Sequence, residues 1–366
     1  MKTDVLKWAA GHPAGKLVSK ETLNHPAIIE MVSGLDVYKN TKEAYRRAYK
    51  ALGIDIVNRV PLENAPAPAE EGCEKRCGDR GQYLSLPLGV YDTVFRERFE
   101  CDTVERFWEL DVEQLSYEDL IVPVPHSYRH DDIISRQNAL GDAGLYYPML
   151  YTTAFMWAVE VLGWEVFMVA AALEPDRFFE KFLKPCAMKS FRIVTEMTAA
   201  SENPFIFLHD DLCNARGPVF QPDWYTKYIF PLYKDIFKPI KDAGKKIIFV
   251  IDGNISHFVP LLPELGIDGV MYETPATPTE LVAEYFGSDG RFFIGGIDTG
   301  VLTFGTPEQI TEMVMDVCEK YSGCPGFALS CCGGLHGNIP LENLIAYFDA
   351  RVQVNATPKD WETCCL

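Results

Sequence analysis

Long apolar runs are missing from this sequence. No stretch of about 18 uninterrupted apolar residues occurs, although a membrane-spanning helix needs that length. The first residues, Met1 to Asp4, lead into a polar helical pattern and not into the apolar core of a signal peptide. We therefore expect a cytoplasmic protein with no membrane partner.

Positive charge is also scarce. The 366 residues include 34 Lys and Arg against 52 Asp and Glu, which gives a formal net charge of -18. Nucleic acids and anionic membranes attract basic surfaces, so this balance argues against both and predicts no nucleic-acid partner. An acidic surface suits an enzyme that acts on a small molecule, or a protein with a basic partner.

A regular cysteine framework is the third missing feature. The chain contains 11 cysteines, an odd number without regular spacing, which is typical of reduced thiols. Cys73 and Cys77 form a Cys-x3-Cys pair, but no second Cys or His pair follows at the spacing of a zinc finger. We expect no structural zinc there.

Apolar residues are abundant enough, at 48%, to form a large core. We expect one domain over residues 1–366, with a helical lead-in at 1–50 and an insertion of loops and hairpins at 61–130. The Pro-, Glu- and Gly-rich stretch 61–78 predicts a loop, and alternation over 82–101 predicts antiparallel hairpins. Residues 54–57 are the first strand candidate.

Strands and helices alternate regularly from residue 143 onward. The expected strands cover residues 145–150, 205–208, 246–251, 269–272, 292–294 and 327–330. The expected helices cover residues 154–161, 174–200, 223–243, 257–265, 279–286, 306–321 and 341–354. Repeated strand-helix units predict an α/β fold with a parallel sheet, and their number approaches the eight of a (β/α)8 TIM barrel.

Polar side chains follow five consecutive strands of this pattern. In (β/α)8 barrels the active site lies at the carboxyl ends of the strands, so these side chains predict one shared site. We predict catalytic roles for Asp210, Asp211, Asp252 and Glu273. Substrate-binding roles are predicted for His209, Asn254, Asp298 and His336, joined by the aromatic residues Tyr151 and Phe155.

The segment from Cys331 to His336 combines two adjacent thiols, two glycines and an imidazole. Thiolates and imidazoles are preferred zinc ligands, and a catalytic zinc needs only three protein ligands. A glycine-rich turn beside an ordinary buried cysteine explains the same residues equally well. The sequence alone does not say whether Cys331 or Cys332 faces the site.

Four segments form a recognisable set: Asp210–Asp211 with Gly217–Pro218, Gly253–Asn254, Gly295–Asp298 and Ile339–Asn343. Together they resemble the uroporphyrinogen decarboxylase superfamily, specifically its cobalamin-dependent methyltransferase branch. The resemblance covers roughly residues 140–355. Members of the superfamily are (β/α)8 barrels.

The resemblance implies methyl transfer from a small methylated substrate to cob(I)alamin, with the cobalamin carried on a separate corrinoid protein. Relatives that act on a thiol hold zinc with a His-x-Cys motif after the strand that corresponds to 246–251, and this chain has Asp252 there. A zinc site made of Asp252, Glu273 and Cys332 or Cys331, with His336 as another replacement ligand, would have harder donors that suit an oxygen substrate. This departure resembles the ether-cleaving O-demethylase members, so an aryl methyl ether is the expected substrate.

Other functions remain open at this point. The methyl donor is alternatively a methylated amine or thiol. A decarboxylase of a small carboxylic acid would need positively charged side chains to bind the substrate carboxylate. The arginine-rich segment that has this role in porphyrinogen decarboxylases is absent before residue 60, so Arg136 and Arg216 are the candidates. A non-catalytic barrel that serves as a scaffold would not need the strand-end carboxylates.

Overall fold

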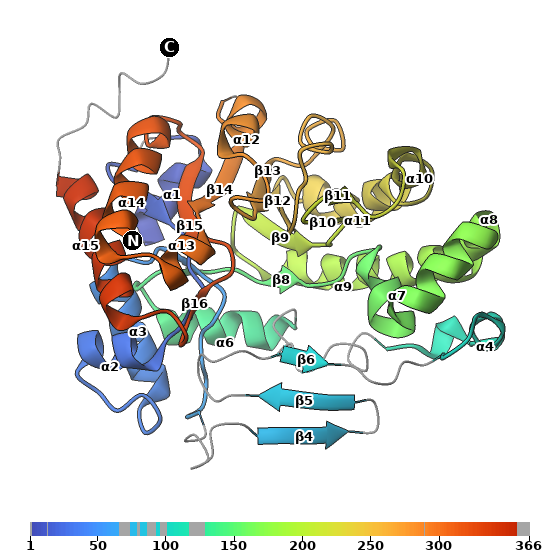
Figure 1. Ribbon diagram of the computed structural model, residues 1–366, viewed down its shortest axis with the longest axis horizontal. Helices are drawn as coiled ribbons and strands as arrows, with labels where there is room; N and C mark the ends of the chain where they lie inside the picture. The colour runs from blue at the N-terminus through green and yellow to red at the C-terminus, as the bar shows by residue number, and fades with distance from the viewer. Residues whose placement is uncertain are drawn as a thin grey trace.

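A curled parallel sheet forms the centre of the molecule. The computed structural model describes residues 2–12, 14–65, 74–78, 81–85, 93–95, 101–116, 129–288 and 290–356. Seven strands pair in the order β1-β15-β14-β13-β12-β9-β8, and every pairing is parallel (Figure 1). Their bounds are β1 Val18–Ser19, β8 Met149–Leu150, β9 Phe205–His209, β12 Lys246–Ile251, β13 Gly269–Tyr272, β14 Phe292–Ile297 and β15 Phe327–Cys331. The expected α/β fold with a parallel sheet is thus confirmed.

Two short strands continue the curl beyond the edges of this sheet. The strand β3 (Ile56–Val57) pairs in parallel with β7 (Leu145–Tyr146), which directly precedes β8 along the chain. An isolated parallel bridge also joins Lys20, just after β1, to Ile56 in β3. This arrangement is consistent with a TIM-like barrel.

Helices surround the sheet and connect its strands (Figure 1). They are α1 Lys2–Ala9, α2 Pro26–Ser33, α3 Thr41–Leu52, α4 Val104–Glu109, the 3-10 helix η1 Val112–Gln114, α6 His130–Leu140, α7 Met156–Leu173, α8 Pro175–Phe178, the π-helix η2 Phe179–Leu183, α9 Lys184–Ala200, α10 Pro222–Tyr228, α11 Phe230–Asp242, α12 Thr279–Phe286, α13 Thr299–Phe304, α14 Pro307–Tyr321 and α15 Leu341–Ala356. The small pairs are β10 (Cys213–Asn214) with β11 (Gly217–Pro218), and β2 (Leu23–Asn24) with β16 (Leu335–His336).

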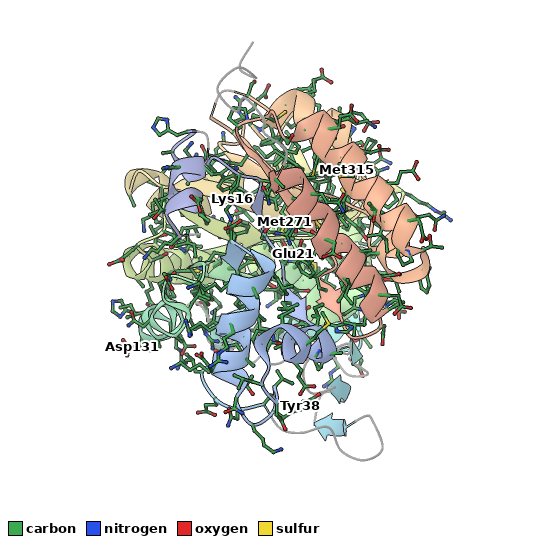
Figure 2. The ribbon with its side chains drawn as sticks, turned by 90° about the vertical axis from the view of Figure 1, so that its left-hand side faces the viewer. Lys16, Glu21, Tyr38, Asp131, Met271 and Met315 are labelled. Carbon is green, nitrogen blue, oxygen red and sulfur yellow. The ribbon has the colours of Figure 1, made fainter. Side chains whose placement is uncertain are left out.

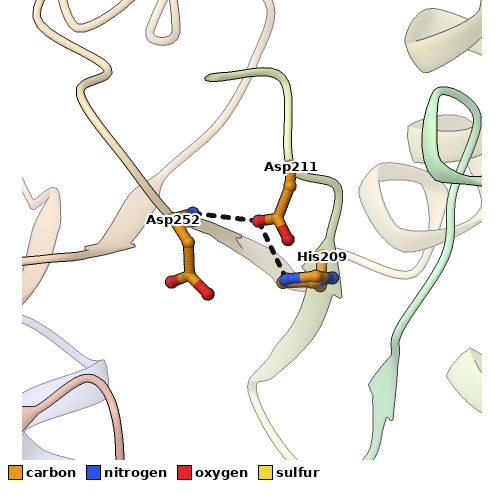
Figure 3. A group of neighbouring side chains, drawn as sticks. All are labelled: His209, Asp211 and Asp252. Atoms are coloured by element: carbon orange, nitrogen blue, oxygen red, sulfur yellow. Dashed lines mark hydrogen bonds and ion pairs between the residues drawn. The ribbon is translucent and has the colours of Figure 1, made fainter. Parts of the chain in front are cut away.

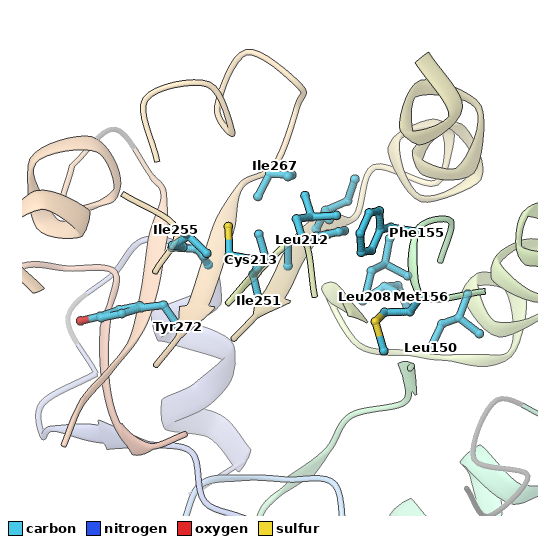
Figure 4. Packing of buried hydrophobic residues seen from close by; sticks show 14 of the residues in the cluster. Leu150, Phe155, Met156, Leu208, Leu212, Cys213, Ile251, Ile255, Ile267 and Tyr272 are labelled. Atoms are coloured by element: carbon cyan, nitrogen blue, oxygen red, sulfur yellow. The ribbon is translucent and has the colours of Figure 1, made fainter. Parts of the chain in front are cut away.

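Alternate side chains of the strands pack into two separate cores. The larger core lies between the strands and the surrounding helices, and Figure 4 shows part of it, including Leu208 and Ile251. The smaller core contains Phe207, Val250 and Met271, together with Trp8 of α1. The indole of Trp8 packs on Phe292 with ring centroids 4.6 Å apart. Because successive side chains of a strand point to opposite faces, the smaller core marks the inner face of the curled sheet.

Several details differ from the predictions. The expected strand at 145–150 is interrupted between β7 and β8, where Pro148 has no N–H to donate. Residues 257–265 form successive turns where a helix was expected. The expected loop at 61–78 contains the strand β4 (Glu74–Gly78), which pairs antiparallel with β5 (Gly81–Ser85). The strand β5 also pairs antiparallel with β6 (Thr93–Phe95), in agreement with the hairpins expected over 82–101. Cys73 lies outside the described residues.

The helix α7 is long and apolar enough to cross a membrane by length and composition alone, with a mean hydropathy of 1.6. In the structure 56% of its residues are buried inside the fold, and Gly163 interrupts its helical geometry with a φ of 70°. A buried core helix satisfies the same two criteria, so this feature is weak evidence for a membrane span.

Candidate metal and catalytic site

The inner face of the sheet presents polar side chains at the carboxyl ends of its strands. Along β9 the inward positions are Phe205, Phe207 and then His209, and along β12 they are Ile248, Val250 and then Asp252. The apolar core therefore ends on an imidazole and a carboxylate. The parallel register pairs His209 with Val250, so Asp252 lies on the same face two residues further along the neighbouring strand. We take this end of the sheet as the candidate site.

The imidazole of His209 is held from both sides. Its Nε2 lies 3.1 Å from Oδ1 of Asp211, and its Nδ1 lies 2.6 Å from the carbonyl oxygen of Tyr151. The half-buried ring of Tyr151 stacks on the imidazole with centroids 4.4 Å apart and an interplanar angle of 18°. These contacts fix the orientation of the ring.

Asp211 also connects His209 to the next strand. Its Oδ1 accepts a hydrogen bond of 3.0 Å from the backbone N–H of Asp252 (Figure 3). One donor atom from each of His209, Asp211 and Asp252 lies within 4.8 Å of the other two. Such a set of one nitrogen and two oxygens suits a divalent metal such as zinc, and His209 is buried while Asp252 is solvent-accessible. The donor set therefore fits a metal that also faces a substrate.

The charges of these groups influence one another strongly. Burial alone would lower the pKa of His209, but the charges of Asp211 and Asp252 outweigh it and raise the pKa to about 9. Burial would raise the pKa of Asp211, but the ion pair with His209 holds it below its ordinary value. The carboxylate of Asp252 is in contact with solvent, but protein surrounds it on most sides. This partial burial, together with the negative charge of Asp211, raises the pKa of Asp252 to about 6.

The metal ligands predicted from the sequence are only partly the ones that the structure assembles. Asp252 belongs to the ligand group, but within the described part of the chain no such group includes Glu273, Cys331 or Cys332. The carboxylate of Glu273 accepts a hydrogen bond of 2.9 Å from Gly253 N–H and so braces the turn after β12. The group that could hold a metal instead includes the imidazole of His209, which was predicted only to bind substrate.

The two adjacent cysteines face opposite directions. Cys331 belongs to the larger outer core, and its Sγ lies 3.2 Å from Oγ1 of Thr299. Cys332 packs on the inner core, and its Sγ donates to the carbonyl oxygen of Tyr272. Cys332 is therefore the thiol that faces the site. Burial raises the pKa of this thiol above its ordinary value, and the nearby charge of Asp252 raises it further.

Asp210 points away from this site. Its carboxylate is fully buried and accepts hydrogen bonds from the backbone N–H groups at the start of α7, including Ala154 and Met156 at 2.8 and 2.6 Å. Tyr233 donates a further hydrogen bond of 2.9 Å. The carboxylate thus satisfies the free amides of a helix N-terminus, and these contacts account for its position.

The remaining predicted substrate residues lie in different places. Phe155 is fully buried in the outer aromatic core, so it does not reach the inner face. The carboxylate of Asp298 accepts from Gly300 N–H at 2.7 Å and caps α13. The side chain of Asn254 accepts from Ser256 N–H at 3.1 Å. His336 is half-buried in β16, whose partner strand is β2 outside the main sheet.

Lys20 is the inner-face residue that the predictions did not include. It follows the inward-facing Val18 of β1, is 2% exposed, and its charge acts on both Cys332 and Asp252. A strand of only two residues gives no periodic signal, so the sequence pattern did not reveal β1 or the lysine at its end.

Comparisons with known proteins address the family. The family model described as uroporphyrinogen decarboxylase (URO-D) matches residues 168–354, just over half of the chain. No curated protein sequence matches. A crystal structure of a sugar phosphate isomerase/epimerase from Parabacteroides distasonis ATCC 8503 aligns with 93% of this chain and 97% of its own at 9% identity, with a TM-score of 0.40, a likeness on which no argument rests. The family match is sufficient: this chain belongs to the uroporphyrinogen decarboxylase (URO-D) family.

Proposed function

We propose that this protein is a methyltransferase of the cobalamin-dependent branch of its superfamily. It moves a methyl group from a small methylated substrate to the cob(I)alamin of a separate corrinoid protein in the cytoplasm. The observation that supports this proposal most is the ligand group of His209, Asp211 and Asp252 at the open end of the inner core. A non-catalytic scaffold would have no need for such a group.

We further infer that the strands close into a (β/α)8 barrel. The pairings run from β8 through the seven-stranded sheet to β1, then through the Lys20–Ile56 bridge to β3 and β7. Since β7 and β8 are consecutive in the chain, counting them as one interrupted strand gives a ring of eight strands. A single domain with its site at the carboxyl ends of the strands follows from this inference.

An aryl methyl ether is the methyl donor that the ligand chemistry favours. Imidazole and carboxylate ligands are harder than the thiolates of relatives that activate a thiol, so they suit a leaving oxygen. During transfer the carbon–oxygen bond breaks with its electron pair on oxygen, and the acceptor supplies the electron pair of the new bond to the methyl carbon. A metal held by the three residues would supply Lewis-acid stabilisation of the negative charge on that oxygen.

The residues of the chain have separate parts in this scheme. Tyr151 and Asp211 fix the ring of His209, and Asp211 also fixes the backbone of Asp252. The accessible carboxylate of Asp252 faces the substrate side of the group. The carboxylate of Glu273 keeps the turn at Gly253 in place, so its role is positioning.

Decarboxylation of a small carboxylic acid is the second candidate. The description of the matching family model and the inward-facing cation of Lys20 both favour it. Decarboxylation releases carbon dioxide and leaves the methyl groups of the substrate in place, so the products distinguish the two reactions.

The test is a methyl-transfer assay with a corrinoid protein held in the cob(I) state and 3-methoxybenzoate as donor. We expect methylcobalamin to form, and Asp252→Ala to lower the rate by about 10²- to 10³-fold, since it removes stabilisation of the transition state. Cys332→Ala, as the matched inner-face control, should keep most of the rate. Carbon dioxide release without methylcobalamin, or a wild-type rate in Asp252→Ala, would contradict the proposal.

A further inference from the structure

Hydrogen bonds hold the turn that carries Asp252 at each of its residues. Four successive backbone N–H groups, from Asp252 to Ile255, donate to four different acceptors. In the order of the donors, the acceptors are the carboxylate of Asp211 at 3.0 Å, the carboxylate of Glu273 at 2.9 Å, the carbonyl oxygen of Asn214 at 2.9 Å and the hydroxyl of Thr277 at 2.9 Å. These acceptors belong to the segments that follow β9 and β13, so the neighbouring strands determine where the turn lies.

Thr277 makes two contacts to this turn with a single hydroxyl. Its Oγ1 accepts the hydrogen bond from Ile255 N–H and donates a hydrogen bond of 2.9 Å to the carbonyl oxygen of Gly253. Thr277 and Ile255 are fully buried, so water does not compete for these groups. A buried N–H or carbonyl group without a partner is costly, so the turn depends on this hydroxyl.

The loop between β13 and α12 holds Gly253 at both its N–H and its carbonyl group. Glu273 contacts the N–H and Thr277 contacts the carbonyl, and Thr277 N–H donates a hydrogen bond of 3.0 Å to the carbonyl oxygen of Glu273, which closes the loop. The preceding strand is anchored by Met271, which belongs to the inner core and lies near the centre of the molecule (Figure 2). Glu273 is exposed, so water can replace its carboxylate as an acceptor, whereas the hydroxyl of Thr277 has no such substitute.

We infer that Thr277 is a positioning residue of the candidate site. By holding the backbone on both sides of Asn254, its hydroxyl sets the direction in which Asp252 presents its carboxylate to the other two members of the ligand group. The inference rests on the proposed function for the role of Asp252 as a metal ligand, but not for the position of the turn. Its consequence is that a residue outside the ligand group controls metal affinity, as residues that orient a ligand typically do.

Amide hydrogen exchange, followed residue by residue in the metal-free protein, tests the position of the turn. Thr277→Val keeps the shape of the side chain and removes the hydroxyl. We expect the N–H groups of Asp252 and Gly253 to exchange about tenfold faster in this variant, although their own acceptors are unchanged. Thr277→Ser retains the hydroxyl and should exchange as the wild type does. Unchanged exchange of both N–H groups in Thr277→Val would overturn the inference.

A matched control removes an equally buried hydroxyl from another part of the fold. Thr41, at the start of α3, is fully buried, and its Oγ1 donates to the carbonyl oxygen of Val37 at 2.6 Å and accepts from Ala65 N–H at 2.8 Å. Thr41→Val therefore loses the same two kinds of hydrogen bond. We expect both valine variants to lose thermal stability, but only Thr277→Val to change exchange in the turn. Equal changes of exchange in both variants would show a global effect and would overturn the inference.

Zinc titration by calorimetry separates this inference from the proposed function. We expect one zinc per wild-type chain, and an affinity about tenfold lower in Thr277→Val but unchanged in Thr41→Val. If the wild type bound no zinc while Thr277→Val exchanged faster, the position of the turn would stand and the metal of the proposed function would be wrong. If the wild type bound zinc and transferred a methyl group while Thr277→Val kept the full zinc affinity, the proposed function would stand and the inference would be wrong.

Discussion

Asp210 and Asp211 are adjacent in the chain but contact different parts of the molecule. Asp211 faces the site and pairs with His209, while Asp210 faces α7 and accepts three backbone N–H groups and the hydroxyls of Thr153 and Tyr233. A displacement of one residue along a strand reverses the direction of the side chain. The same alternation explains why Cys332 faces the site and Cys331 does not.

Replacing Asp210 should therefore affect stability more than chemistry. In Asp210→Ala the amides at the start of α7 and the hydroxyl of Tyr233 lose their acceptor inside the protein. An unsatisfied buried donor costs about 1–3 kcal/mol, so we expect the free energy of unfolding to fall by about 3–5 kcal/mol.

Urea denaturation measures this change, with the accessible Asp252→Ala as a control that should stay within about 1 kcal/mol of the wild type. If Asp210→Ala were as stable as the wild type but inactive, Asp210 would be catalytic after all.

His209 gives a prediction about pH. In the metal-free protein its pKa is raised from 6.5 to about 9. The folded state therefore keeps a proton that the unfolded chain loses, so this contribution to stability is complete below pH 6.5 and disappears as the pH rises through 9. Asp211→Asn removes the ion pair, so the effect of burial, which lowers the pKa of His209, is opposed less strongly.

Nuclear magnetic resonance of the imidazole ring, recorded against pH with a chelator present, follows this titration directly. We expect the midpoint of His209 to move to lower pH in Asp211→Asn. An unchanged midpoint would show that Asp211 does not control the charge of His209.

At the scale of secondary-structure elements, the turn after β12 holds the candidate site in position. Gly253 follows Asp252 with a φ of 80°, and a Cβ at this residue would lie 2.8 Å from the carbonyl oxygen of Asn214 in the β10–β11 hairpin. A side chain would therefore push the two segments apart as well as strain the backbone. Glycine here permits β12 to approach the hairpin closely.

Gly253→Ala should lower stability by about 1–3 kcal/mol and also weaken metal binding, because Asp252 moves with the turn. Gly266→Ala is the matched control: its φ is 87°, but the added Cβ would meet only Lys241 Cε at 3.5 Å. We expect the control to lose stability without any change in metal affinity, which calorimetry measures. Equal metal affinity in both variants would show that the turn does not position Asp252.

The regular elements were more predictable than the way in which they meet. Strands such as β12 and β13 have the predicted bounds, since a run of apolar residues that ends at an acidic residue, here Asp252 or Glu273, is a strong local signal. The strand β1 was not predicted as part of the barrel, because a strand of two residues shows no periodic pattern. The helix α1 was not predicted as part of the barrel either, because its Trp8 packs on Phe292, a residue far away in the sequence.

The candidate site shows the same limit. The sequence identified Asp252 and its neighbours at the strand ends, but only the alternation of inner and outer faces in three dimensions selects His209 and Asp211 as its partners. The cysteines had the stronger chemical signal, yet hydrogen bonds to Thr299 and to the carbonyl oxygen of Tyr272 account for both thiols.

At the scale of the whole molecule, the central claim is that β9 and β12 bring one imidazole and two carboxylates together to bind a metal. Zinc titration by calorimetry tests it most directly, with wild type, Asp211→Asn and Cys332→Ala compared under the same conditions. We predict one zinc per chain in the wild type and in Cys332→Ala, and an affinity lower by at least about tenfold in Asp211→Asn. Loss of zinc in Cys332→Ala, together with unchanged binding in Asp211→Asn, would contradict this account.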